Sequence, residues 1–313
     1  MSSSAQVKQP GWYFRLSSFF RSKFGRPIYK IPLDAGFSCP NRDGTTGSRG
    51  CTYCYNPSFA PFSGDKKITP VREQITRGKK KKSRGLYLAY FQAYTNTYAP
   101  VEQLKNLYDE ALADQEVIGL SIATRPDCIS EEIIELLENY ARRCHLWVEY
   151  GLQSAHDQTL ARINRGHNAG AFADAVKLTR NRGIYICAHI ILGLPGETTA
   201  MMLETIDFLN RLQVNGVKFH HLQVIKHTTL AEEYERGLVS TYEKAENYIP
   251  VLCDCLERLS PEIVIHRLAS QVTSKEFLIA PHWPESAVQI AAAVEQELKK
   301  RGTRQGYEYN PGV

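Results

Sequence analysis

Three cysteines lie close together near the start of the chain. Cys39, Cys51 and Cys54 all fall within the stretch DAGFSCPNRDGTTGSRGCTYCYNPSFAP, residues 34–61. Thiolates are common ligands of zinc and of iron–sulfur clusters. A structural zinc ion usually takes four protein ligands, yet the nearest histidine, His145, is 91 residues beyond Cys54. A self-contained zinc module is therefore excluded, and a zinc site completed from a distance, or three free thiols, stays an alternative.

The other interpretation is a [4Fe–4S] cluster that these three thiolates hold. Such a cluster keeps one iron without a protein ligand, and that iron can bind a small molecule. Pro40, Gly44, Gly47 and Gly50 lie within the loop, and glycines let a backbone wrap closely around a bulky inorganic group. The loop therefore predicts a reactive metal centre.

The elements that must position this loop alternate along the chain. Apolar runs typical of buried parallel strands recur about every 30 residues, and stretches with helical spacing separate them. Strands are predicted at residues 28–36, 86–94, 117–124, 146–153, 184–194 and 217–225. Six such units with right-handed crossovers predict an α/β fold, a partial (β/α)6 TIM-like barrel, with a doubly wound open sheet as the alternative.

The chain divides into four predicted parts. They are an N-terminal lead-in (1–26), the core barrel (27–235), an α-rich C-terminal extension (236–303) and a tail (304–313). The pattern at 262–268 also favours a short strand within the extension. With no export signal and no run of about 18 apolar residues, we expect a cytoplasmic protein without a membrane partner.

Several motifs follow the cysteine loop at the spacing of successive strands. They are ATRPDCI (123–129), VEYGLQSAHDQTLARINRGH (148–167), HIILGLPGET (189–198) and VKFHHLQVIKHTTLAEEY (217–234). With Cys39-Pro40 in the loop, they resemble the radical S-adenosylmethionine (SAM) superfamily. The core is similar to the Elongator catalytic subunit and to oxygen-independent coproporphyrinogen oxidases. It also resembles an uncharacterised bacterial radical SAM group with the pattern GFSCPNRDG. The C-x11-C-x2-C spacing departs from the usual C-x3-C-x2-C by a long insert.

The resemblance implies two cofactors and a type of reaction. Cys39, Cys51 and Cys54 would ligate a [4Fe–4S] cluster, and the open iron would bind SAM. Reductive cleavage of SAM would then give methionine and a 5′-deoxyadenosyl radical, which abstracts a hydrogen from the substrate. The electron would come from an external reductant, expected to be a flavodoxin- or ferredoxin-like protein.

The resemblance also implies contacts to SAM. Gln153 would bond the ribose and Arg165 the carboxylate, since a planar guanidinium suits a carboxylate. The stretch QAYTNTYAP replaces the usual GGEP after the second predicted strand, so Thr95 and Asn96 are our expectation for the amino group. The full implied set is Tyr53, Thr95, Asn96, Gln153, Arg165, Ile191, Gly193 and Leu194.

Strand alternation points to a second group of polar residues. Side chains two positions apart share a face of a strand, so an inward face would carry Glu149, His189, Lys218 and His220 into the barrel lumen. Buried charges are costly unless they are paired or used. A structural Glu–Lys pair and a substrate-binding role are equal alternatives, and no residue is assigned a catalytic role.

A basic run bears on the substrate. RGKKKKSR, residues 77–84, holds six positive charges in a chain whose net charge is +5. It is either a solvated loop or an arm that contacts phosphates. We favour an RNA substrate such as a tRNA base. The alternatives are a radical SAM enzyme with a small-molecule or tetrapyrrole substrate, and a zinc-stabilised nucleic-acid-binding protein.

Overall fold

The fold is built on one curved sheet of seven parallel strands. The computed structural model describes all residues except 1–10, 61–67, 82–84, 271, 273 and 313. The strand order is β1-β2-β3-β4-β5-β6-β8, so neighbours in the sheet follow the order of the chain. The strands are β1 (Ile28–Leu33), β2 (Leu86–Phe91), β3 (Val117–Thr124), β4 (His145–Gln153), β5 (Tyr185–Leu192), β6 (Gly216–His221) and β8 (Val264–Arg267).

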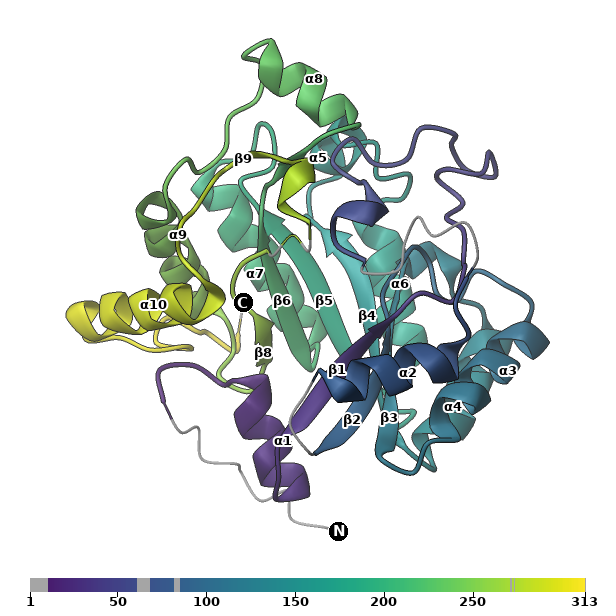
Figure 1. Cartoon of the computed structure of the whole chain (residues 1–313). Coiled ribbons are helices and arrows are strands. Elements are labelled where there is room, and N and C mark those ends of the chain that lie inside the picture. Colours follow the sequence, from purple (N-terminus) through teal and green to yellow (C-terminus); the bar gives the residue numbers. More distant parts are fainter. Residues whose placement is uncertain (1–10, 61–67, 82–84, 271, 273, 313) are drawn as a thin grey trace.

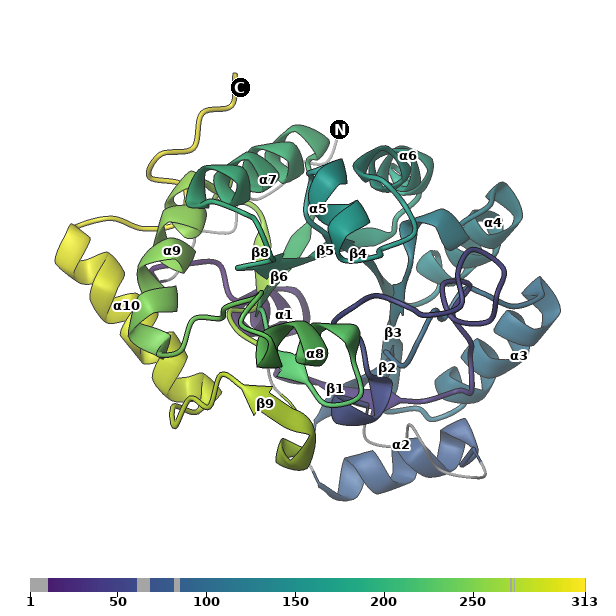
Figure 2. The same cartoon turned by 90° about the horizontal axis from the view of Figure 1, so that it is seen from above.

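The helices lie mainly on the convex side of this sheet. Figure 2 shows α2, α3, α4, α6 and α7 ranged around its outside. The helices are α1 (Leu16–Phe24), α2 (Val71–Lys80), α3 (Val101–Leu112), α4 (Glu131–Ala141), α5 (Asp157–Arg162), α6 (Ala169–Thr179), α7 (Thr199–Leu212), α8 (Thr229–Glu235), α9 (Ala245–Arg258) and α10 (Ala287–Arg301). Side chains of Ser130, Asn168 and Thr198 accept hydrogen bonds from the first turns of α4, α6 and α7.

The prediction of a partial barrel is confirmed. Among the strands of the described residues, β1 pairs only with β2 and β8 only with β6, so the sheet curls without closing. Outside these strands, Arg15 forms an isolated parallel bridge to Ile265 of β8. The six predicted core strands are present, and β8 from the C-terminal extension adds a seventh, as the pattern at 262–268 indicates. A separate antiparallel pair, β7 (Val224–Ile225) and β9 (Leu278–Ala280), lies near α8 (Figure 1).

The amino ends of the strands are covered by the predicted lead-in. Phe14 and Phe20 pack with Leu88, Trp147 and Val264 in a buried apolar cluster, and α1 lies at this lower end of the sheet in Figure 1. The amide of Ile265 donates to the carbonyl of Phe14. The lower end is thus filled, which leaves the carboxyl ends of the strands as the open end of the half-barrel.

Two segments outside the core barrel are also tied to it. Gln305, in the predicted tail, is buried and bonds the carbonyls of Ser260 and Ile263, while its own side chain accepts from the amide of Phe14. The amphipathic helices α9 and α10 pack on each other beside α7. Across the described part of the chain, no helix has the length and apolar character to span a bilayer.

One interpretation of the basic run is wrong in part. Residues 77–80 form the last turn of α2 rather than a solvated loop, and Lys79 pairs with Asp114 and Glu116. Residues 82–84 of the run lie outside the described residues.

Candidate active site

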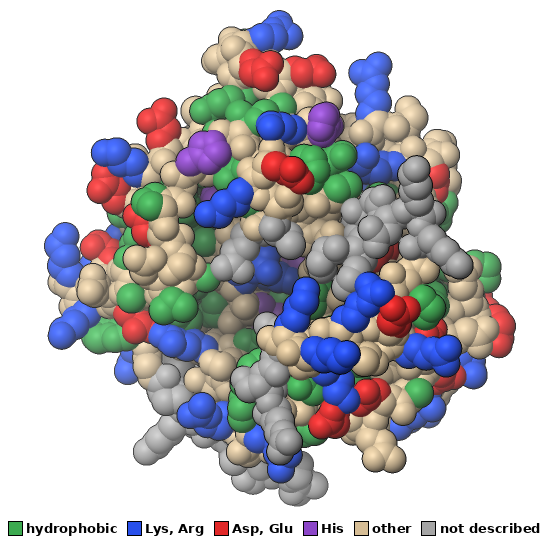
Figure 3. Space-filling model, viewed as in Figure 1, with side chains coloured by type: hydrophobic (Ala, Val, Ile, Leu, Met, Phe, Trp, Pro, Cys, Tyr) green, Lys and Arg blue, Asp and Glu red, His purple; other side chains and the backbone are tan. Residues whose placement is uncertain are grey.

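A cavity of about 820 Å³ opens at the carboxyl ends of the strands. This volume lies within the range of small-molecule sites. Figure 3 shows the cavity as a hollow near the centre of the face viewed, with basic side chains inside and around it. Its walls come from the cysteine loop, from β1 to β6, from α2, and from β8 and the segment after it. The half-barrel and its C-terminal extension therefore build the site together.

The structure brings the three cysteines of the loop to this cavity. Cys39, Cys51 and Cys54 all line it. The loop is clamped to the segment after α5 because Asn41 Nδ2 donates to the carbonyl of Asn164 (2.7 Å) and Asn164 Nδ2 donates to the carbonyl of Gly50 (2.7 Å). These reciprocal amide bonds fix the loop beside Arg165, although 114 residues separate Gly50 from Asn164.

The three loop thiols are not gathered within the span of a single zinc ion in this structure. Ligands of one zinc ion lie within about 4.6 Å of one another, because each Zn–S bond is about 2.3 Å. Among the described residues, the one set of three metal-ligand types within 4.8 Å is Glu149, Cys187 and His266, not the loop cysteines. Burial and the neighbouring Cys51 raise the pKa of Cys54 to about 11. A bound cationic centre would reverse that effect and favour thiolates.

Arg165 occupies the position next to the cysteines. It is buried; Nη2 donates to the carbonyl of Gly151 (2.6 Å), Nη1 lies 3.6 Å from the sulfur of Cys51, and Nε has no partner among the described residues. A Cβ at position 151 would stand 2.5 Å from Arg165 Nη2 and 2.7 Å from Gln153 Nε2. The bare backbone of Gly151 therefore lets two polar side chains converge beside the loop, and the Nε–H of Arg165 is a donor left unused among the described residues.

Gln153 ends β4 in an unusual backbone conformation. Its φ is +76°, and the pairing with β5 shifts register between Gly151 and Gln153. Non-glycine residues with positive φ are uncommon, and such strain concentrates at functional sites. The irregular end of β4 directs the Gln153 side chain to the cavity, which it lines.

The other predicted SAM contacts divide into two sets. Tyr53, Thr95 and Ile191 line the cavity, whereas Asn96, Gly193 and Leu194 do not. The Asn96 amide donates to the carbonyl of Ala123 (2.8 Å), so its side chain joins β2 to β3. All eight assignments remain predictions, and the structure favours Thr95 over Asn96 as a cavity contact.

The lumen residues predicted by strand alternation come together around one carboxylate. Glu149 is buried, and its Oε2 is 3.0 Å from Lys218 Nζ and 2.6 Å from His189 Nε2. Despite its burial, Lys218 and Lys30 hold the pKa of Glu149 well below its usual value. Burial lowers the pKa of Lys218 to about 8. The expected Glu–Lys pair is therefore present, and all four predicted lumen residues line the cavity.

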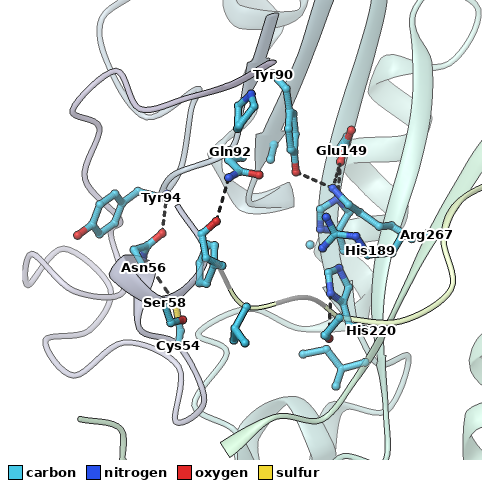
Figure 4. Close-up of a pocket in the computed structure, with 18 of the residues that line it drawn as sticks. Cys54, Asn56, Ser58, Tyr90, Gln92, Tyr94, Glu149, His189, His220 and Arg267 are labelled. Carbon is cyan, nitrogen blue, oxygen red and sulfur yellow. Dashed lines mark hydrogen bonds and ion pairs between the residues drawn. The ribbon is translucent and has the colours of Figure 1, made fainter. Parts of the chain in front are cut away.

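Sequence reasoning missed part of this cluster. Lys30 pairs with Glu149, and Tyr90 accepts a hydrogen bond from Lys218 Nζ (2.6 Å). Arg267 and His266 enter the cavity from β8. Figure 4 shows Arg267 beside His189, on the opposite side of the cavity from Cys54. The same alternation rule applied to β1 and β2 would have indicated Lys30 and Tyr90, since each shares a face with other cavity-lining residues.

Comparisons with known proteins agree with this geometry. The family model described as the radical SAM superfamily matches residues 44–209, and that of the Radical_SAM C-terminal domain matches residues 214–300. The protein named "Uncharacterized protein YtqA" from Bacillus subtilis is 39% identical over 297 residues, covering 94% of this chain and 92% of that protein. This chain belongs to the radical SAM superfamily and is an enzyme of that class.

Two more distant similarities cover less of the other protein. The tRNA uridine(34) acetyltransferase of Methanocaldococcus infernus is 31% identical over 138 residues, which cover 43% of this chain and 25% of that protein. The solved structure of Elp3 from the same organism, with an N-terminal deletion, has a TM-score of 0.65 at 18% identity and covers 89% of this chain. This chain spans 64% of that structure, and the likeness shows a shared fold.

Proposed function

We propose that this enzyme cleaves SAM reductively at a [4Fe–4S] cluster and acts on a nucleic acid, with a tRNA base as the reacting group. The family implies both cofactors. The observation that carries the substrate assignment is the continuity of one cavity, lined at one side by the three cysteines and at its rim by basic residues of α2.

Each cofactor has residues that fit it. Cys39, Cys51 and Cys54 would hold the cluster, and Arg165, with its unpartnered Nε, would bind the carboxylate of SAM. When bound, the cluster supplies the electron that splits SAM into methionine and a 5′-deoxyadenosyl radical. The chain's residues keep Arg165 and Gln153 in place through Gly151, and Arg125 Nη1 supports the Arg165 carbonyl (2.8 Å). An external flavodoxin- or ferredoxin-like protein is the proposed reductant.

The basic rim supports a polyanionic substrate. Arg77 and Lys81 line the cavity, and Figure 3 shows basic side chains gathered over α2 beside the hollow. Gly78 lies against Ile31, so close that any side chain there would collide with it. The glycine thus lets α2 pack directly on β1, which holds its basic end at the cavity mouth. Phosphates are attracted by such positive surfaces.

The similarity to a tRNA-modifying protein points the same way. The matching part of the tRNA uridine(34) acetyltransferase covers 43% of this chain. A transfer RNA would bring a phosphate backbone to α2 while a base reaches the cavity. A tRNA substrate therefore accounts for both the basic residues at the rim and the cavity beside the cysteines.

The first experiment tests the chemistry. Protein purified without oxygen should contain about four iron and four sulfide per chain and, with dithionite, should convert SAM to 5′-deoxyadenosine. Cys54→Ser should lose iron and this activity. Cys144→Ser is the matched control, because Cys144 lies outside the cavity lining and should retain both. Stoichiometric zinc in place of iron would contradict the proposal.

The second experiment tests the substrate. Modified nucleosides in tRNA are compared between cells that contain the gene and cells that lack it. Loss of one modified nucleoside, restored by the wild-type gene and not by Cys54→Ser, is the expected result. An unchanged nucleoside profile would contradict a tRNA substrate and favour a small molecule.

A further inference from the structure

The cavity carries a large excess of positive charge. Among its described lining residues, one is acidic, Glu149, and eight are basic. The basic residues are Lys30, Arg42, Arg77, Lys81, Arg125, Arg165, Lys218 and Arg267. Arg165 faces the cysteines and Arg77 and Lys81 form the rim, so these are already assigned. Arg42 donates to the carbonyl of Cys54, and Arg125 pairs with Asp127. The cations that remain are Lys30, Lys218 and Arg267, from β1, β6 and β8.

Glu149 cannot neutralise all three of these partly or fully buried cations. Its Oε1 accepts from Lys30 and from Ser121 Oγ (2.5 Å), while its Oε2 accepts from Lys218 and His189. The carboxylate is therefore fully engaged by two lysines. Three cations against one acid give 3 − 1 = +2 in this part of the cavity. Buried charge without compensation is costly.

Arg267 is the cation of these three that has no acidic partner among the described residues. No described acidic residue pairs with its guanidinium, and β8 places it directly beside Lys218 in the ladder with β6. Like charges at partner positions of neighbouring strands repel each other. Lys218 Nζ has three donor hydrogens and uses two, on Tyr90 and Glu149. Two cationic groups with unused donors thus face the same space.

The histidines nearby do not supply compensation. Burial lowers the pKa of His189 to about 4 and that of His266 to about 3, and it also takes the pKa of His220 well below its usual value. All three are therefore neutral at pH 7 and can only add hydrogen bonds. The missing partner is an anion from outside the chain.

We propose that Lys218 and Arg267 form an anion-binding subsite that holds a carboxylate or phosphate group of the substrate. This assignment rests on the proposed function, since it names a second anchor within the same cavity. Figure 4 shows Arg267 of this subsite across the cavity from Cys54. A substrate held there by its charged group would present its remaining atoms toward the cysteine side.

The test measures anion binding rather than turnover. The cluster-loaded enzyme is saturated with SAM, without reductant, so that the Arg165 site is filled. Unfolding temperature is then followed against inorganic phosphate or acetate at constant ionic strength, which gives an apparent Kd for each probe. A tighter Kd for phosphate identifies a phosphate group as the ligand, and a tighter Kd for acetate identifies a carboxylate.

Substitutions at Arg267 show whether the proposed subsite is responsible for the anion binding. Arg267→Gln should weaken binding of the preferred probe by about tenfold or more, because charge-assisted hydrogen bonds are lost. Arg267→Lys, which keeps the charge, should restore measurable binding, and Arg236→Gln, at an exposed position after α8, should bind like the wild type. Equal Kd values for wild type and Arg267→Gln, or no stabilisation by either probe, would overturn the proposal.

A failure of the proposed function can be distinguished from a failure of the anion subsite. If wild-type enzyme with dithionite releases no 5′-deoxyadenosine, the radical SAM chemistry fails. The anion titration involves no reduction, so its outcome stands independently of that result.

Discussion

The guanidinium of Arg165 and the backbone of Gly151 are in direct contact: Nη2 donates to the Gly151 carbonyl at 2.6 Å. Position 151 has no room for a Cβ, which would lie 2.5 Å from that nitrogen. Gly151 belongs to β4, and Arg165 follows α5 beside the cysteine loop. One hydrogen bond thus couples the end of the central strand to the proposed SAM site.

Gly151→Ala is expected to impair SAM binding without removing the cluster. The new methyl group would displace Arg165 and Gln153, while the cysteines keep their positions. We expect the apparent Kd for SAM to rise by about tenfold or more, as for loss of a hydrogen bond to a charged group. Equilibrium binding of SAM and iron content are the measurements.

Gly170→Ala provides the matched control for that substitution. Gly170 lies in α6, and a Cβ there would come no closer than 3.3 Å to the side chain of Asn168. Its SAM affinity should equal that of the wild type. Wild-type affinity in Gly151→Ala would show that the contact does not position Arg165 for SAM.

Glu149→Gln should destabilise the fold strongly. The amide removes the counter-charge of Lys30 and Lys218, and an uncompensated buried charge costs about 3–5 kcal/mol of unfolding free energy. Urea unfolding of anaerobically purified protein measures the change. Glu246→Gln, in an exposed pair with Lys244, should change stability by less than about 0.5 kcal/mol. Comparable effects of both substitutions would contradict the central role of Glu149.

The stability contributed by Lys218 should depend on pH. Burial lowers its pKa to about 8 in the folded protein, whereas the ordinary value is 10.5. Between these values the unfolded chain binds more protons at this residue than the folded chain. Folding stability from this group therefore rises with pH in that window. Below pH 8 both states are protonated and the group gives no slope.

The comparison with Lys218→Met isolates this effect. Groups that do not contact Lys218 titrate alike in both proteins, and Glu149 and the neighbouring histidines ordinarily titrate below this window. The difference in unfolding free energy should therefore shift in favour of the wild type between pH 8 and pH 10.5. Urea unfolding at several pH values in that window is the measurement. A constant difference, or one that shifts toward the variant, would show that burial does not lower the pKa of Lys218.

Much of the fold was predictable because local patterns and global architecture agree. Apolar runs separated by helical stretches located the core strands, and Val117–Thr124 was predicted to the residue. Strand alternation alone also predicts that Glu149, His189 and Lys218 face one cavity, which all three line. Side chains alternate between the two faces of a strand, so this prediction requires only that the inward face is chosen correctly. In buried central strands, the sequence pattern identifies that face.

Other parts depend on contacts that sequence does not contain. The basic end of α2 is helical because Gly78 packs on Ile31 and Lys79 pairs with Asp114, which are tertiary contacts. Arg267 lies beside Lys218 because β8 joins β6 across a register shift. Alternation within a four-residue strand could not predict that both His266 and Arg267 would line the cavity.

The charge at the cavity rim should govern binding of nucleic acid. Replacing Arg77 and Lys81 by Gln removes two cations from the mouth of the cavity. Each lost phosphate contact should reduce the slope of log K against log salt concentration by about 0.7–0.9. Binding of unmodified tRNA at several salt concentrations is the measurement.

The matched control is Lys299→Gln with Lys300→Gln, which removes the same charge from the C-terminal end of α10 and should leave the slope unchanged. If the α10 variant lost as much slope as the α2 variant, binding would reflect net charge alone. If neither variant lost any, α2 would not contact phosphates.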